Sequence, residues 1–101
     1  MCGNGNYADI GIFSFHPVKH IACGEGGMIT TNSEALYKKL SLLRTHGITK
    51  DNMEENHGGW YYEMQELGFH YRITEMQCAL ALSQFKKLEQ FIERRRTLAK
   101  K

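Results

Sequence analysis

The sequence predicts an α/β fold, because strand-like and helix-like segments alternate along its first half. Residues 7–15 are apolar on both faces, which is typical of a strand buried inside a mostly parallel sheet. Residues 28–31 form a second short segment that is rich in β-branched side chains. Leu36, Leu40 and Leu43 then recur with the spacing of one helix face. We expect two or three short strands and about three helices.

Capping signals indicate where the helices begin and end. Thr31 and Glu34 have the spacing of a capping box, which satisfies free N–H groups of a first helical turn. Gly47 stands where a helix commonly ends. Thr74 and Gln77 repeat the capping-box spacing, and helical periodicity then continues to the end of the chain without a stop signal. This open end, and two strands with no further strand to pair with, predict an internal piece of a larger protein.

The segment from residue 48 to residue 70 shows no sustained periodicity. Structureless stretches of this length are unusual inside a compact domain and are usually functional or packed on a partner. Trp60, Tyr61 and Tyr62 are too apolar to be left in water, which counts against a disordered linker. A short strand within residues 60–65 is one way to order them.

Composition limits the class of protein. A chain of 101 residues, 42% hydrophobic and 24% charged, is ordinary for one small soluble domain. The net charge of +2 is too small to indicate a nucleic-acid or membrane surface. Three cysteines without a CxxC pair favour reduced thiols in a cytoplasm. No stretch is apolar enough to span a bilayer, and the first ten residues do not resemble a signal peptide.

One short stretch carries the strongest chemical signal. It runs from the first predicted strand into a turn fixed by Pro17, and it ends in Lys19. A neutral lysine amine can condense with an aldehyde cofactor to form a Schiff base. We expect burial or a neighbouring cation, such as His16 or His20, to favour that neutral form. Judged on spacing alone, a lysine on a solvent-facing loop is the competing interpretation.

The sequence around Lys19 resembles the cofactor-lysine segment of the DegT/DnrJ/StrS family of nucleotide-sugar aminotransferases, which use pyridoxal phosphate. The resemblance lies in residues 14–19 and 24–32, continues through residues 43–47, and resumes at residues 66–80. These blocks come in the family's order and span nearly the whole chain. Within the family, the chain looks most similar to the branch that aminates keto-sugars for pseudaminic acid.

The resemblance implies a fold-type-I enzyme with a three-layer α/β/α large domain that works as a homodimer. Residues 1–73 would carry the cofactor-lysine strands, a helix and a loop, and residues 74–101 would carry helices leading to a C-terminal small domain. An upstream segment would supply the acidic residue that pairs with the pyridine nitrogen. We therefore predict that the 101-residue piece is inactive by itself.

The resemblance also implies an activity. Lys19 would bind the cofactor covalently and then move a proton as general base and acid. The enzyme would transfer an amino group, with glutamate as the expected donor, to a nucleotide-linked 4-keto-6-deoxy sugar. The product would enter surface polysaccharide or flagellin glycan. The enzyme itself would work in the cytoplasm. Some relatives with histidine in place of the lysine are dehydratases, so Lys19 favours transamination.

Further site residues follow from the same resemblance. Ser14 would hydrogen-bond the cofactor phosphate, although a hydroxyl at a strand end also bonds nearby backbone. His16 and His20 are expected to line the substrate side. His70 stands where many relatives have an asparagine that reaches the cofactor phosphate across the dimer interface. Arg72 would bind that phosphate or pair with a carboxylate, and a plain surface arginine is the alternative.

A metal site is disfavoured by the spacing of the candidate ligands. His16 and His20 are four residues apart, but Pro17 between them opposes a single helix face. The remaining histidines and cysteines lack the spacing of a zinc finger. This holds for Cys2, Cys23, Cys78, His57 and His70.

Two other classes of protein compete with an aminotransferase. The first is a non-catalytic or truncated relative that keeps only the fold. The second is a basic helical module that binds a partner such as DNA, suggested by the basic cluster Arg94–Arg96 near the end of the chain. Glu89 and Glu93 interleave the same helix, so a solvated helix face is the better interpretation of that cluster.

Overall fold

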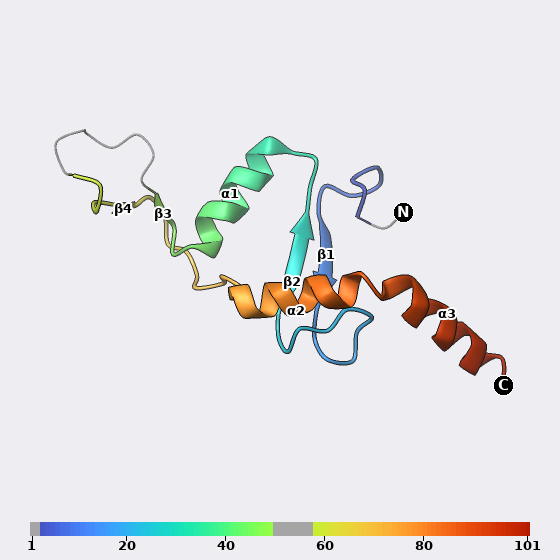
Figure 1. Ribbon diagram of the computed structural model, residues 1–101. Helices are drawn as coiled ribbons and strands as arrows, with labels where there is room; N and C mark the ends of the chain where they lie inside the picture. Colours follow the sequence, from blue (N-terminus) through green and yellow to red (C-terminus); the bar gives the residue numbers. More distant parts are fainter. Residues whose placement is uncertain (1–2, 50–57) are drawn as a thin grey trace. The chain divides into compact units, whose positions relative to one another are not determined.

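The computed structural model describes residues 3–49 and 58–101 (Figure 1). Its described part contains short strands and three helices. In chain order these are β1 (Gly11–Ser14), β2 (Gly27–Thr30), α1 (Glu34–Arg44), β3 (Ile48–Thr49), β4 (Glu63–Met64), α2 (Glu75–Phe85) and α3 (Leu88–Ala99). The chain divides into two compact units, and each is described by itself. The first unit combines Met1–Thr30 with Ile73–Lys101, and the second is Thr31–Arg72.

The first unit is built on an antiparallel hairpin. β1 and β2 lie side by side, with Gly11 opposite Thr30 and Ser14 opposite Gly27 (Figure 1). The strand predicted over residues 7–15 is therefore shorter than expected, and its observed partner is antiparallel rather than parallel. The loop of residues 15–26 joins the two strands, and β2 runs back beside β1 in the opposite direction. Ile12 is 78% exposed, so the expectation of two buried faces is wrong for the described chain.

Two helices complete the first unit. α2 begins with the predicted capping box: the Gln77 N–H donates to Thr74 Oγ1 at 3.3 Å, and the Thr74 N–H donates to Gln77 Oε1 at 3.1 Å. Together these bonds satisfy two N–H groups at the helix start. α2 ends at Phe85, and α3 starts at Leu88 after a break at Lys86 and Lys87.

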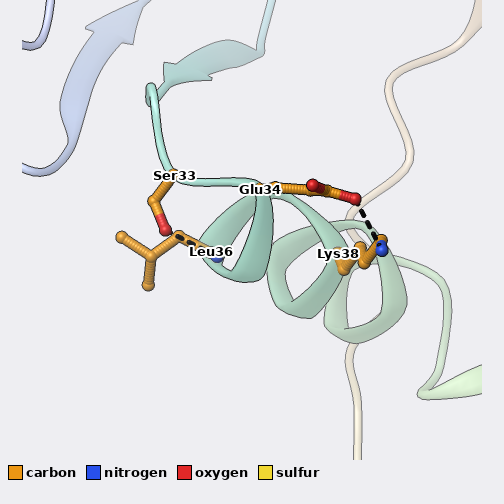
Figure 2. A network of polar contacts seen from close by, with 4 residues as sticks. All are labelled: Ser33, Glu34, Leu36 and Lys38. Carbon is orange, nitrogen blue, oxygen red and sulfur yellow. Dashed lines mark hydrogen bonds and ion pairs between the residues drawn. The ribbon is translucent and has the colours of Figure 1, made fainter.

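In the second unit, the N-cap of α1 lies two residues later than the capping signal predicts. The Leu36 N–H donates to Ser33 Oγ at 3.3 Å, so Ser33 is the N-cap (Figure 2). The predicted box at Thr31 is wrong, because the Thr31 hydroxyl instead accepts the N–H of Ser33 at 3.1 Å. Glu34 is then the first helical residue, and its carboxylate pairs with Lys38 at 2.7 Å (Figure 2). A carboxylate in the first turn also interacts favourably with the helix dipole.

A tight turn follows α1. His46 adopts φ 60° and Gly47 adopts φ 68°, so the left-handed ending starts one residue before the predicted glycine. Gly47 has a second constraint, since an added Cβ would overlap the carbonyl of Glu66. β3 then pairs with β4, with Ile48 opposite Met64. A short strand within residues 60–65 is thus confirmed, and it is antiparallel.

Little apolar surface is removed from water in the described part of the chain. Cys23 is the one fully buried hydrophobic residue there, at 2% exposure. Ile12, Leu67 and Met76 are each more than three-quarters exposed. Hydrophobic burial is the main favourable term in folding, so each unit has only a thin core of its own. No helix in the described residues is both long and apolar enough to cross a membrane.

Candidate active site

Lys19 lies in the loop that joins β1 to β2. Backbone hydrogen bonds close this loop at its base, from Phe15 N to Gly26 O at 2.8 Å and from Cys23 N to Phe15 O at 3.0 Å. Inside the loop, Lys19 N donates to His16 O at 2.9 Å. The backbone at the lysine is therefore fixed, while its side chain is exposed. The described residues do not shield this side chain from water as expected. Gln77 of α2 and Ile73, which precedes α2, reach the loop beyond the lysine, at residues 25 and 26.

Ser14 and His16 order the start of the loop. The His16 N–H donates to Ser14 Oγ, and the Val18 N–H donates to His16 Nδ1, each at 3.4 Å. The local backbone bond considered as an alternative for Ser14 is thus present. A hydroxyl has one proton and two lone pairs, so Ser14 can still donate that proton to an anion. An accepting Nδ1 puts the proton of a neutral His16 ring on Nε2, which can also donate.

The far side of the loop is fastened to α2. Gln77 Nε2 donates to the carbonyl of Glu25 at 2.8 Å, and Cys23 Sγ donates to the same oxygen at 3.4 Å. Burial raises the pKa of the Cys23 thiol, with smaller contributions from Cys78 and the Glu25 carboxylate. Cys23, Glu25 and Gln77 were not predicted to hold the lysine loop in place. The glycines around Glu25 signal a tight turn, but no local pattern predicts a bond between residues 52 positions apart.

An open pocket of about 290 Å³ lies beside Lys19 in the first unit. Its walls come from the lysine loop and from the two C-terminal helices. The residues of interest are Lys19, His20, Gln84, Phe91, Arg94 and Arg95. Arg94 and Arg95 are exposed, as the interpretation of a solvated helix face predicts, and they also face the same pocket as the lysine.

His70 and Arg72 belong to the second unit. An Arg72 guanidinium nitrogen lies 3.1 Å from His70 Nε2, and because arginine only donates, that ring nitrogen accepts. The His70 ring also packs edge-on against His46, with ring centroids 4.9 Å apart. The backbone on either side is tied to the end of α1, since Phe69 N donates to Leu43 O at 2.7 Å. Arg72 is therefore a surface arginine, as the alternative interpretation has it, and its guanidinium bonds to His70.

The predicted site residues thus fall into two groups. Ser14, at the end of β1, and His16, Lys19 and His20, in the loop that follows, belong to the first unit, whereas residues 70 and 72 lie in the second. Among residues 3–49 and 58–101, no three histidine, cysteine or acidic side chains gather as a metal site would require. Cys2 and His57, which the sequence analysis considered as ligands, lie outside the described residues.

A hairpin loop that presents one lysine, with a serine at the end of the preceding strand, matches what a covalently bound aldehyde cofactor needs. The sequence pattern of the DegT/DnrJ/EryC1/StrS aminotransferase family matches residues 3–101. The chain belongs to this family.

Curated relatives include a nucleotide-sugar transaminase and a polysaccharide biosynthesis protein. A UDP-4-amino-4,6-dideoxy-N-acetyl-beta-L-altrosamine transaminase from Campylobacter jejuni subsp. jejuni serotype O:2 is 44% identical over 95 residues, which are 94% of this chain and 24% of that protein. The spore coat polysaccharide biosynthesis protein SpsC from Bacillus subtilis is 39% identical over 97 residues, which cover 94% of this chain and 25% of that protein. This chain therefore spans about a quarter of the length of the curated relatives it matches.

Solved structures of sugar aminotransferases share the fold. Helicobacter pylori PseC, an aminotransferase of pseudaminic acid biosynthesis, matches with a TM-score of 0.74 and 37% identity, over 85% of this chain and 22% of that one. The putative sugar aminotransferase Spr1654 from Streptococcus pneumoniae, in its PMP form, matches with a TM-score of 0.80 and 30% identity, over 92% of this chain and 25% of that one. The short strands and three helices described here are thus part of an aminotransferase fold, as the sequence predicted.

Proposed function

We propose that this chain is the cofactor-lysine segment of a longer pyridoxal-phosphate-dependent aminotransferase, called the parent enzyme below. The supporting observation is the position of Lys19, whose backbone is fixed by the hairpin while its amine is exposed. The family match over residues 3–101 supports the same assignment. Exposed apolar side chains on both units are what a segment packed against the rest of such an enzyme would have.

The side chains of the loop fit pyridoxal phosphate. Lys19 offers the primary amine that its aldehyde requires. Ser14 accepts a backbone N–H and keeps its own proton for a phosphate oxygen. When bound, the cofactor would supply an electron sink for the carbon that loses its proton. The solved PLP and PMP forms of Spr1654 support this cofactor for the family fold.

Lys19 would have two functions in the parent enzyme. Its amine would attach the cofactor, and after release by the amino donor it would take and return a proton as general base and acid. A side chain that performs both steps needs a fixed backbone and a mobile amine. The hydrogen bond from Lys19 N to His16 O fixes the backbone, and the exposed side chain keeps its rotational freedom.

The residues around the lysine would bind rather than react. His16 can donate through Nε2, and His20 lines the pocket beside the lysine, so both are suited to the oxygen-rich sugar substrate. We propose that His70 and Arg72 bind the cofactor phosphate from the partner subunit of a homodimer. Arginine pairs strongly with phosphate oxygens, and its bond to His70 would hold the guanidinium in place.

The substrate that we propose is a nucleotide-linked 4-keto-6-deoxy sugar, with glutamate as amino donor. The support is the printed activity of the C. jejuni relative and the pathway of H. pylori PseC. The product would enter surface polysaccharide or flagellin glycan. We place the parent enzyme in the cytoplasm, where thiols such as those of Cys23 and Cys78 stay reduced.

Reductive labelling tests the proposal directly. The parent enzyme is mixed with pyridoxal phosphate, reduced with borohydride and digested, and its peptides are weighed. We expect the phosphopyridoxyl mass on the Lys19 peptide. The peptide that carries Lys38 and Lys39 is the internal control, because both are exposed lysines outside the loop. Label on the control peptide alone, or no label at all, would refute the assignment.

A further inference from the structure

His46 follows α1 in a backbone conformation that few side chains adopt. Its φ of 60° lies in the left-handed region, and among residues 3–49 and 58–101 it is the only non-glycine residue with a positive φ. Such residues are uncommon, because in this region a Cβ crowds the following carbonyl. The next residue, Gly47, is also left-handed, so the turn already has its glycine. The imidazole at position 46 therefore needs an explanation beyond the turn itself.

The segment that carries His70 runs alongside the end of α1, and backbone bonds hold it on both sides of that residue. His46 N donates to Phe69 O at 2.8 Å, and Tyr71 N donates to Arg44 O at 3.0 Å. The main chain at His70 is therefore fixed by the end of α1. What these bonds do not fix is the orientation of the His70 ring.

Two side chains fix that orientation. The rings of His46 and His70 meet edge to face, with centroids 4.9 Å apart and an interplanar angle of 89°. The Arg72 guanidinium donates to His70 Nε2 at 3.1 Å, so a neutral His70 carries its proton on Nδ1 and can donate from there. A flip of the ring would exchange the two nitrogens. The edge contact with His46 restrains that flip and so keeps Nδ1–H on one side.

We propose that His46 is a positioning residue for His70, holding its ring so that Nδ1–H is the group offered to the cofactor phosphate. His46 acts through His70 and does not touch the phosphate. It is half-buried, whereas His70 and Arg72 are exposed, which suits a support rather than a ligand. The inference rests on the proposed function, in which residues 70 and 72 bind that phosphate, and it adds the residue that orients them.

The main experiment is a double-mutant cycle on the affinity of the full-length parent apoenzyme for pyridoxal phosphate. His46→Asn removes the ring, and asparagine tolerates the left-handed backbone, so the turn is kept. We expect roughly three- to tenfold weaker binding, the value of one aromatic edge contact. In a His70→Ala background the same change should alter the affinity by less than about 1.5-fold, because the group through which His46 acts is gone. A merely structural His46 would weaken binding equally in both backgrounds.

A rescue variant and a spectroscopic signature sharpen the test. His46→Phe restores a ring edge without a ring nitrogen, so its affinity should lie within about twofold of wild type. The phosphorus resonance of the bound cofactor should match the wild type in His46→Phe and shift in His46→Asn, because the hydrogen bonding of the phosphate changes only there. Lys38→Met, on the exposed face of α1, is the control and should change neither quantity. Thermal unfolding of each apoenzyme checks its fold, and if His46→Phe melts early, the cycle decides by itself.

Three results would overturn the inference. The first is unchanged cofactor affinity in His46→Asn or in His70→Ala. The second is an equal loss from His46→Asn with and without the His70 ring. The third is a stably folded His46→Phe that binds as weakly as His46→Asn, which would mean that a nitrogen of His46 is used directly. Absence of the phosphopyridoxyl label on Lys19 in the wild-type enzyme refutes the proposed function instead, so the two failures are distinguishable.

Discussion

The Lys19 loop and the segment around His70 are fixed in different ways. In the loop, backbone bonds and a glutamine from α2 fix the main chain, while the lysine side chain is left without a described partner. In the His70 segment the side chains restrain one another: His70 contacts His46 and Arg72, and the ring of Phe69 stacks on Tyr71 at 4.9 Å. The first arrangement leaves the amine proposed to react mobile on a fixed backbone, and the second restrains the side chains proposed to bind phosphate.

The largest expected effect concerns the mobile group. Lys19→Arg keeps the charge but removes the primary amine, so the parent enzyme should lose about 10²- to 10⁴-fold in transamination rate. Lys38→Arg, on the exposed face of α1, is the control and should retain full activity. The rate is measured with keto-sugar nucleotide and glutamate. Activity within tenfold of wild type in Lys19→Arg would place the reactive amine elsewhere.

The next prediction concerns the tightly packed turn of the second unit. Gly47 has φ 68°, and a Cβ there would overlap the Glu66 carbonyl, so Gly47→Ala should lower the free energy of unfolding by about 2–4 kcal/mol. Gly59 has open space around its Cα, and Gly59→Ala is expected to change stability by less than about 0.5 kcal/mol. Denaturant unfolding of the parent enzyme measures both. Equal effects would mean that the turn tolerates a side chain.

Helix caps give a smaller effect that differs between the units. Thr74→Ala removes the two hydrogen bonds of the Thr74 hydroxyl, one from the Gln77 N–H and one to Gln77 Oε1, whereas Ser33→Ala removes a single bond from the Leu36 N–H. We expect losses of about 1–2 kcal/mol for the first and about 0.5–1 kcal/mol for the second. Thermal unfolding at a fixed protein concentration compares them. A larger loss in Ser33→Ala would contradict the capping geometry.

The smallest effect belongs to the exposed ion pair of Glu34 and Lys38. Their side chains are 79% and 72% exposed, so a double-mutant cycle with Glu34→Gln and Lys38→Met should give a coupling of about 0.3–0.5 kcal/mol. Salt should reduce it, because exposed charges are screened. A coupling above about 1 kcal/mol, unchanged by salt, would show that water does not reach the pair.

Short sequence patterns predicted those features of the fold that depend on residues close together in the chain. The Thr74 capping box and the leucine face of α1 were correctly predicted, because each depends on residues within a few turns of one another. The cap of α1 was misplaced, since two nearby hydroxyls, at Thr31 and Ser33, are both able to cap a helix, and only Ser33 accepts an N–H of its first turn. The antiparallel pairing of β1 with β2 was not predicted. An apolar strand predicts burial, but not which strand covers it.

The candidate site shows the same division. Lys19 and Ser14 were recognisable because a short motif carries both. The bond from Gln77 to Glu25 was not, since it joins positions that only the folded chain brings together. Nor did the sequence show that Arg94 and Arg95 face the pocket beside Lys19, because their helix is amphipathic and their charges read equally well as a solvated surface.

The first unit is discontinuous, and this sets an order of events during synthesis. The hairpin leaves the ribosome first, but the glutamine that clamps its loop, and Ile73 that packs near Gly26, emerge more than forty residues later. A nascent chain that stops within the second unit has the lysine loop but lacks Gln77, which bonds to it. We therefore expect the loop to be held in place only after α2 is complete, and a chain interrupted earlier would carry Lys19 on a loop that α2 does not hold.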